Sequence, residues 1–106
     1  MIELTKENFE KEVKNENGVV FVDFWSPKCI PCAGLVPEVE AFAKENEGRA
    51  KFCKLDIASN KRLSISQKVM SVPTMVLYKN GEKTHEFDKE SIDFDVIQSK
   101  LDELLV

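Results

Sequence analysis

The segment FVDFWSPKCIPCAGLVPEVEAF, residues 21–42, contains the features from which the architecture of this chain follows. It begins inside an apolar, β-branched and aromatic run, Val19–Trp25, with the composition of a strand covered on both faces. From Cys32 the apolar residues recur at helical spacing, which predicts a helix to about Asn46. Cys29 and Cys32 therefore lie where a strand passes into a helix.

The remaining residues alternate between patterns typical of helices and of strands. Thr5 is expected to cap a first helix and Ser91 a last one, because hydroxyl side chains accept from free N–H groups at helix starts. The turn residues Asn80 and Gly81 predict a tight hairpin. The other expected elements are helices over residues 6–15 and 60–69, strands over 50–57, 74–79 and 83–87, and a final helix with an apolar stripe of Phe94, Ile97, Leu101, Leu104 and Leu105.

This order predicts a single α/β domain over residues 1–106, with a central mixed β-sheet and helices on both faces. The chain has 106 residues, of which 42% are hydrophobic, enough for one core. Its formal charge is −4 and both signs are interspersed, which argues against a nucleic-acid face or a polybasic membrane anchor. No secretory or membrane-spanning pattern is recognisable, so we expect a cytoplasmic protein. We also expect it to be a monomer.

The two cysteines at the start of the predicted helix suit thiol chemistry. A thiol attacks as its thiolate, and the free N–H groups of a first helical turn stabilise such an anion. Lys28, directly before Cys29, adds a positive charge, so we expect Cys29 to have a lowered pKa and to act as the nucleophile. Pro31 suits the first turn because it has no N–H to leave unpaired. Cys32 aligns with the buried stripe of the helix and is expected to be the shielded, resolving thiol.

The residues alone leave open two alternative roles for the cysteine pair. The pair could be half of a zinc site, but the chain offers only Cys53 and His85 as further Cys or His ligands, and neither lies in a second paired motif. The cysteines could also be small core residues. We expect Cys53 itself to be a buried hydrophobe and His85 a surface strand residue. No metal or cofactor is expected.

Asp23 interrupts the apolar strand Val19–Trp25. Burial of a bare carboxylate is costly, so this position predicts either a raised pKa or a charged partner. The alternative is an edge position with access to solvent.

Four motifs together resemble the thioredoxin family over essentially the whole chain: VDFWSPKCIPC (22–32), KLDI (54–57), SVPT (71–74) and YKNGE (78–82). The resemblance implies the thioredoxin fold and a reversible disulfide between Cys29 and Cys32. It also implies that Asp23 moves protons to and from Cys32, that Lys54 is its charged neighbour, and that Pro73 is a cis proline facing the disulfide. The residues expected to contact a partner protein are Trp25, Lys28, Ile30, Pro31, Val72 and Pro73.

This resemblance further implies protein disulfides as substrates and a thioredoxin reductase as the source of electrons. The WSPKCxPC form is similar to thioredoxins associated with glycine, sarcosine and betaine reductases, so components of such complexes are expected partners. Lys28, Ile30 and Ser71 depart from the usual family residues, and the FDKES segment (87–91) lacks a glycine that is common there. The competing function is a binding module that uses the same fold to dock on a larger enzyme.

Overall fold

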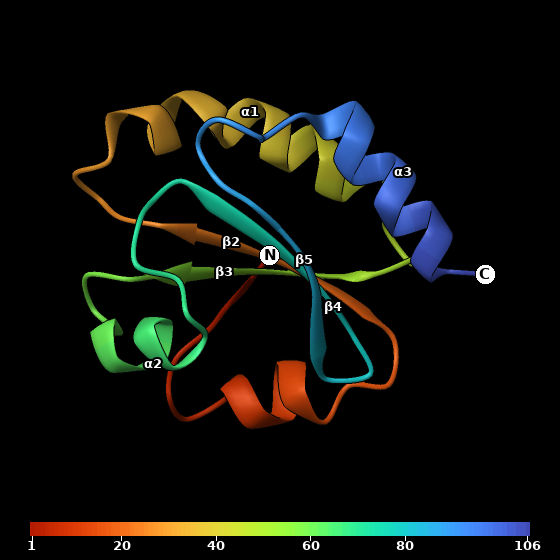
Figure 1. Cartoon of the computed structure of the whole chain (residues 1–106), viewed down its shortest axis with the longest axis horizontal. Helices are drawn as coiled ribbons and strands as arrows, with labels where there is room; N and C mark the ends of the chain where they lie inside the picture. The colour runs from red at the N-terminus through yellow and green to blue at the C-terminus, as the bar shows by residue number, and fades with distance from the viewer.

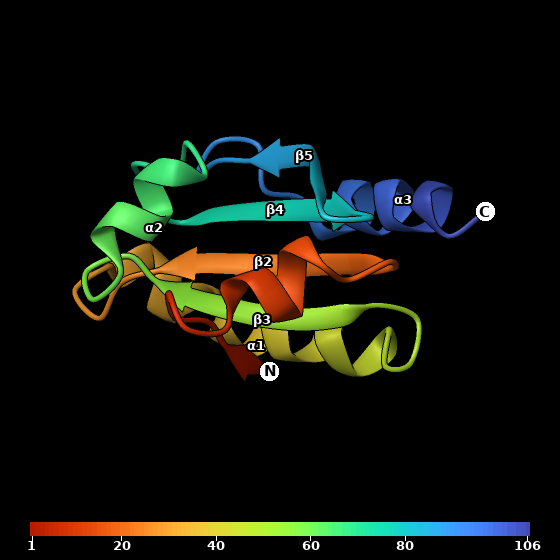
Figure 2. The same cartoon turned by 90° about the horizontal axis from the view of Figure 1, so that it is seen from below.

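The computed structural model describes all residues from 1 to 106, and its centre is a five-stranded sheet in the order β1-β3-β2-β4-β5 (Figures 1 and 2). β1, β3 and β2 run parallel to one another, whereas β4 is antiparallel to both β2 and β5. The mixed sheet predicted from the sequence is therefore confirmed. The strands are β1 (Ile2–Glu3), β2 (Val19–Trp25), β3 (Lys51–Asp56), β4 (Thr74–Lys79) and β5 (Glu82–Phe87).

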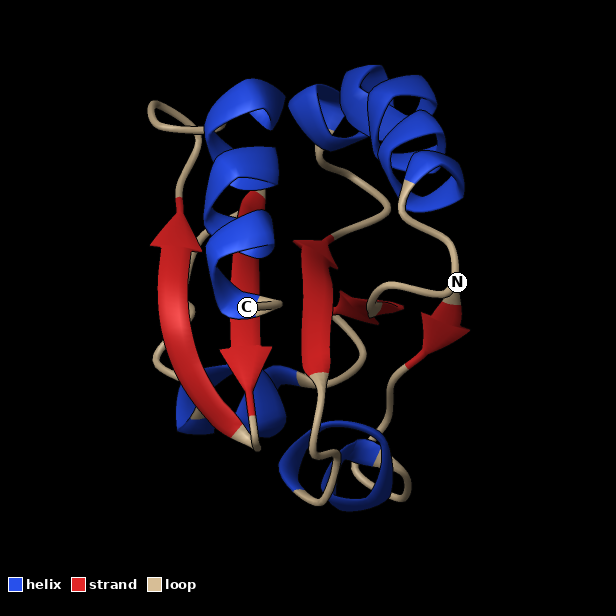
Figure 3. Ribbon diagram, turned by 90° about the vertical axis from the view of Figure 1, so that its right-hand side faces the viewer, coloured by secondary structure: helices blue, strands red, loops and turns tan.

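Four helices cover the two faces of the sheet, as Figures 1 and 3 show: η1 (Glu10–Lys14), α1 (Ile30–Glu45), α2 (Lys61–Ser66) and α3 (Phe94–Leu104). α1 and α3 lie on one face, and η1 and α2 lie on the other (Figure 1). None of these helices combines the length and the apolar character that a membrane span requires.

The central strand β2 contributes side chains to a separate hydrophobic cluster on each face. Its alternation sends Val19 and Phe21 toward α1 and α3, and Val20, Val22 and Phe24 toward η1 and α2. A strand that packs on both sides requires apolar residues at nearly every position, which explains the composition of this segment. Asp23 belongs to the α1 side by the same alternation.

The first helix differs from the prediction. The expected α-helix over residues 6–15 is replaced by turns and a short π-helix, in which the Asn15 N–H donates to the Glu10 carbonyl five residues earlier at 2.8 Å. Thr5 caps only a local turn, where its hydroxyl accepts from the Glu7 N–H at 3.2 Å. Phe9 and Val13 are nevertheless both buried, because the wide turn still presents them to the sheet.

The last helix starts from a different cap. Asp93, not Ser91, accepts from the Asp95 N–H at 2.9 Å, while the Ser91 hydroxyl accepts from the Asp88 N–H at 2.9 Å in the preceding turn. Leu105, at the C-terminal end of the helix, is 36% exposed and does not belong to the buried stripe.

The hairpin between β4 and β5 is confirmed. Asn80 and Gly81 have positive φ angles of 52° and 81°, the combination required by a tight type I′ turn. A Cβ atom at Gly81 would collide with the backbone carbonyl oxygen of Lys14, so this position has room only for glycine.

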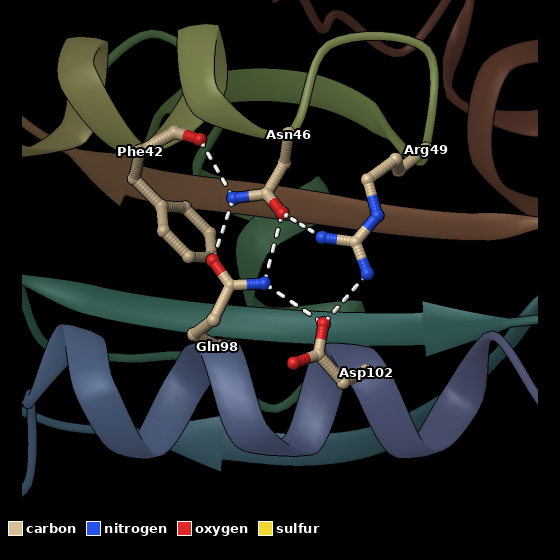
Figure 4. A network of polar contacts seen from close by, with 5 residues as sticks. All are labelled: Phe42, Asn46, Arg49, Gln98 and Asp102. Carbon is tan, nitrogen blue, oxygen red and sulfur yellow. Dashed lines mark hydrogen bonds and ion pairs between the residues drawn. The ribbon is translucent and has the colours of Figure 1, made fainter.

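A polar network joins the end of α1 to α3 (Figure 4). Asn46, only 1% exposed, donates to the Phe42 carbonyl at 2.9 Å and to Gln98 Oε1 at 2.8 Å, and its own oxygen accepts from Arg49 and Gln98. The side chains of Arg49 and Gln98 both donate a hydrogen bond to Asp102 Oδ1, at 2.7 and 2.9 Å. The network fixes the two helices beside each other over the sheet.

Candidate active site

Cys29 and Cys32 lie at the N-terminus of α1 and are joined by a disulfide, with their Cα atoms 5.2 Å apart. Cys29 is the N-cap residue, and the backbone N–H of Cys32 donates to Cys29 Sγ at 3.1 Å. The helix begins at Ile30, two residues earlier than predicted, which places Pro31 in its first turn as expected.

The two sulfur-bearing residues differ in exposure. Cys29 is partly exposed, whereas Cys32 is only 8% exposed. The first turn of α1 carries no acidic side chain, so no carboxylate opposes the positive end of this helix at Cys29. The geometry therefore offers one accessible sulfur beside free N–H groups and one sulfur held inside.

A cavity of about 440 Å³ lies beside the disulfide on the α1 side of the sheet. It brings together five residues that the sequence identified, because their strands and helix converge there. These are Asp23, Trp25, Cys29, Cys32 and Lys54. The cavity also contains residues that no sequence pattern indicates, among them Met1 and Glu40.

Asp23 is largely buried in this cavity, and burial raises its pKa from 3.8 to about 6. Lys54 is its register partner on the adjacent parallel strand β3, and its positive charge acts in the opposite direction. Burial outweighs the attraction, because a charge in a low-dielectric site loses more hydration than one neighbouring cation restores. The sequence predicts a raised pKa or a charged partner for a carboxyl here, and Asp23 has both. An edge position is excluded because Asp23 lies on the central strand.

Trp25 closes another side of the same cavity. The ammonium nitrogen of Lys54 lies 5.8 Å from the centre of its ring, within the range of a cation–π contact. The same nitrogen lies 3.9 Å from Glu3 Oε1. Lys54 is thus shared among an indole, a surface carboxylate and the buried Asp23.

A second, more open groove of about 470 Å³ also borders Cys29. Five of the residues predicted from the sequence line it: Lys28, Cys29, Ile30, Pro31 and Val72. Val72 is joined to the buried Pro73 by a cis peptide bond, as the family resemblance implied. Ser26 and Lys89 complete the groove, and no pattern in the sequence indicates that Lys89 belongs there.

The structure does not bring a zinc ligand set to the cysteine pair. Cys53 is fully buried in the cluster on the η1 face, away from α1, and His85 lies on β5. Burial raises the pKa of the Cys53 thiol to about 12, so Cys53 stays protonated and is a core residue as predicted. His85 is half-buried and stacks beside Phe87.

Comparisons with known proteins agree with this geometry. A protein-family model described as Thioredoxin matches residues 1–103. The chain is 42% identical over 90 residues to a thioredoxin of Peptoclostridium acidaminophilum, covering 85% of this chain and 82% of that protein. It is 43% identical over 90 residues to a thioredoxin of Acetoanaerobium sticklandii, with coverage of 85% and 86%.

The fold agrees as well. A solved thioredoxin structure from Halobacterium salinarum NRC-1, a point mutant, superposes with a TM-score of 0.85 at 28% sequence identity. The match covers 99% of this chain and 90% of that one.

Proposed function

Since the chain belongs to the thioredoxin family and is a thiol-disulfide oxidoreductase, we propose that it reduces partner-protein disulfides with Cys29 as attacking thiol and Cys32 as resolving thiol. The observation that carries this proposal is the unequal exposure of the two residues at the start of α1. Only Cys29 is accessible to an incoming disulfide. Residues 1–106 act in this proposal as one domain.

Two exchange steps accomplish the reduction. The Cys29 thiolate attacks one partner sulfur, a mixed disulfide forms, and the other partner sulfur leaves as a thiolate that takes up a proton. The Cys32 thiolate then attacks Cys29 Sγ, the internal disulfide forms, and the second partner thiol is released. The partner gains two electrons and this protein is oxidised by two, so the sulfurs carry the electron pair themselves.

The helix start supports the first step. A sulfur at the N-cap that accepts the Cys32 N–H retains a donor when it becomes an anion, and the positive end of α1 stabilises the same charge. Lys28 adds a positive side chain next to Cys29 in the chain.

Asp23 supports the second step in this proposal. A resolving thiol must lose a proton before it attacks, and Asp23 lies in the same cavity as Cys32 with a pKa of about 6. A carboxyl with that pKa accepts and returns a proton near neutral pH more readily than an ordinary aspartate. Lys54 moderates the pKa of Asp23 and is a positioning residue rather than a group that touches the sulfurs.

Partner binding is assigned to the open groove and its surroundings. Lys28, Ile30, Pro31 and Val72 line the groove, Pro73 fixes the turn behind Val72, and Trp25 borders the disulfide from the cavity side. The electrons are proposed to come from a flavin-dependent thioredoxin reductase. The reaction fits the cytoplasm, where the thiol pool keeps protein cysteines reduced.

A narrower proposal concerns the partners. The WSPKCxPC segment, residues 25–32, supports components of a glycine-reductase-type complex as substrates. The relatives with 42% and 43% identity are thioredoxins, which supports the chemistry and leaves the partner to be identified by capture.

An insulin-reduction assay with dithiothreitol tests the proposed activity. Wild-type protein should accelerate precipitation of the reduced insulin chains, and Cys29→Ser should abolish the acceleration. Cys53→Ser is the matched control, because it removes a thiol that is buried on the other face of the sheet. A docking module whose disulfide is incidental would show the same rate for wild type and Cys29→Ser.

A further inference from the structure

The open groove beside Cys29 carries two lysines from distant parts of the chain. Lys28 precedes Cys29, and Lys89 comes from the turn that follows β5. Neither side chain forms an ion pair, although Lys51, Lys54, Lys83 and Lys100 each do so elsewhere. Both lysines of the groove are exposed and free to meet a charge on a partner.

No carboxylate lines this groove, in a chain whose formal charge is −4. Asp88 and Glu90 flank Lys89 in the chain. The Asp88 carboxylate is engaged within its own turn, where it accepts from the Glu90 N–H at 3.1 Å and bonds the Ser91 hydroxyl at 3.0 Å. Asp88 and Glu90 both keep their charge, but neither lines the groove. The lining itself therefore carries two cations and no anion, next to the sulfur that a partner must reach.

The groove also offers an apolar surface. Ile30 is 84% exposed and Val72 is half-buried, and both line the groove together with the two lysines. A ligand that fits this groove presents an apolar side chain and a negative charge close together. A segment of polypeptide around a disulfide can supply both.

We propose that Lys28 and Lys89 select partner disulfides that are flanked by aspartate or glutamate. The inference rests on the proposed reductase function and adds the substrate class to it. Exposed charge pairs act mainly on the rate of encounter and are weakened by salt. Each lysine is expected to change the reduction rate roughly two- to five-fold at low ionic strength.

Two synthetic peptides closed by one internal disulfide provide the probe. Their loops are identical, and the residues flanking the cysteines are aspartate and glutamate in one peptide and asparagine and glutamine in the other. The reduced protein is mixed with each peptide, and the reduced product is followed by chromatography. The measured quantity is the ratio of the two rate constants, acidic over neutral, at about 20 mM and about 500 mM salt.

Using the ratio cancels changes in the reactivity of Cys29, which matters for Lys28→Gln because Lys28 also adjoins that thiol in the chain. Lys89→Gln lies far from Cys29 in the chain and is the cleaner variant. Lys11→Gln is the matched control, since Lys11 is an exposed lysine on η1, which covers the opposite face of the sheet.

Wild type and Lys11→Gln should favour the acidic peptide at low salt, with the ratio approaching one at high salt. Lys89→Gln and Lys28→Gln should each lower the low-salt ratio by the stated factor. A wild-type ratio of one, or a ratio unchanged by Lys89→Gln, overturns the inference while leaving the reductase function intact. If wild type reduces the neutral peptide no faster than Cys29→Ser does, the proposed function itself fails.

Discussion

Lys54 lies opposite Asp23 in the parallel register of β3 and β2, so the two side chains occupy the same face of the sheet. That face is the one covered by α1, and both residues line the cavity that contains Cys32. Burial nevertheless has a larger effect on the pKa of Asp23 than the positive charge of Lys54, and raises that pKa to about 6. This relationship places a group that titrates near neutral pH beside the shielded thiol.

The first prediction concerns the stability of Asp23→Asn. Because the pKa of Asp23 is raised on folding, the folded protein binds this proton more tightly than the unfolded chain does. Stability therefore falls as pH rises from about 3.8 to about 6, and then stays level. Ionised Asp23 lowers the free energy of unfolding at pH 7 by roughly 3 kcal/mol or less. Asp23→Asn should therefore be more stable than wild type by about 1–3 kcal/mol at that pH.

Urea unfolding of oxidised protein at a series of pH values measures this difference. The extra stability of Asp23→Asn over wild type should shrink below pH 6 and vanish near pH 4, where Asp23 itself is neutral. The same variant should exchange disulfides more slowly near neutral pH, because the proton acceptor is lost. Glu38→Gln, which neutralises an exposed carboxylate on α1, is the control. Equal rates for Asp23→Asn and wild type at every pH would remove Asp23 from the mechanism.

The second prediction concerns the order in which the cysteines react. In the reduced protein, iodoacetamide should modify Cys29 first, because Cys29 is the most accessible of the three and lies at the start of α1. Cys53 should not react while the protein is folded, since it is 0% exposed and its pKa is about 12. Peptide mass mapping after brief alkylation measures the order in which the cysteines are modified. The control is urea-unfolded protein, in which all three cysteines should react. Early labelling of Cys53 would contradict the burial of its side chain.

The third prediction tests the turn between β4 and β5. Gly81→Ala should lower the free energy of unfolding by about 2–4 kcal/mol, because alanine strains the positive φ of 81° and its Cβ collides with the Lys14 carbonyl oxygen. Gly34→Ala is a control with the opposite sign. Gly34 is exposed in α1 with no atom near its side-chain position, so alanine there should stabilise by about 0.5–1 kcal/mol. Urea titration of both variants measures the two effects, and a Gly81→Ala protein as stable as wild type would refute the close approach.

The fourth prediction concerns the network in Figure 4. Asn46→Ala removes a buried amide and leaves Gln98 Oε1 without its donor, whereas the Phe42 carbonyl still accepts from the backbone N–H of residue 46 and Gln98 Nε2 still donates to Asp102. The loss should cost about 1–3 kcal/mol. Arg49→Ala breaks the ion pair with Asp102, whose two side chains are about half exposed, at 46% and 50%. It also removes one donor to Asn46 Oδ1, but that oxygen still accepts from Gln98. Its cost should stay below about 1 kcal/mol. A larger loss for Arg49→Ala than for Asn46→Ala, measured by thermal unfolding, would show that the surface pair holds the helices together.

These elements differ in how far the sequence predicts them. β2 and the hairpin at Asn80 and Gly81 follow from local composition and turn chemistry, so the sequence predicts them to within a residue. The two residues of β1 form a strand only because β3 is there to pair with them, and no local pattern marks them. The predicted cap of α3 is wrong because Ser91 and Asp93 are both good caps, and the turn at Asp88 decides between them by engaging Ser91.

The residues of the active site also differ in how far the sequence predicts them. Cys29, Cys32 and Asp23 can be identified because strand, motif and helix adjoin in the sequence. Their convergence with Lys54 follows from the parallel register of two strands, which a family resemblance supplies and spacing alone does not. Lys89 cannot be predicted in the groove, because only the folded chain brings the turn after β5 to the N-terminus of α1.

The fifth prediction identifies the partners through the proposed order of attack. If Cys29 attacks first and Cys32 resolves, Cys32→Ser stops after the first step and leaves Cys29 joined to its substrate. Immobilised Cys32→Ser, incubated with native cell extract and eluted with dithiothreitol, should release a small set of proteins. Cys29→Ser, which keeps the buried thiol and loses the accessible one, should release almost none.

The composition of the captured set tests the narrower proposals. Components of a glycine-reductase-type complex and a flavin-dependent thioredoxin reductase should be among the proteins that mass spectrometry identifies. Substrate cysteines in the set should have aspartate or glutamate nearby more often than those captured by Lys89→Gln combined with Cys32→Ser, because the groove would have lost one of its two free cations. A broad catch of unrelated proteins would indicate a general reductant. Equal capture by Cys29→Ser and Cys32→Ser would contradict the assigned roles of the two thiols, since a covalent adduct can form only on a cysteine that the substrate reaches.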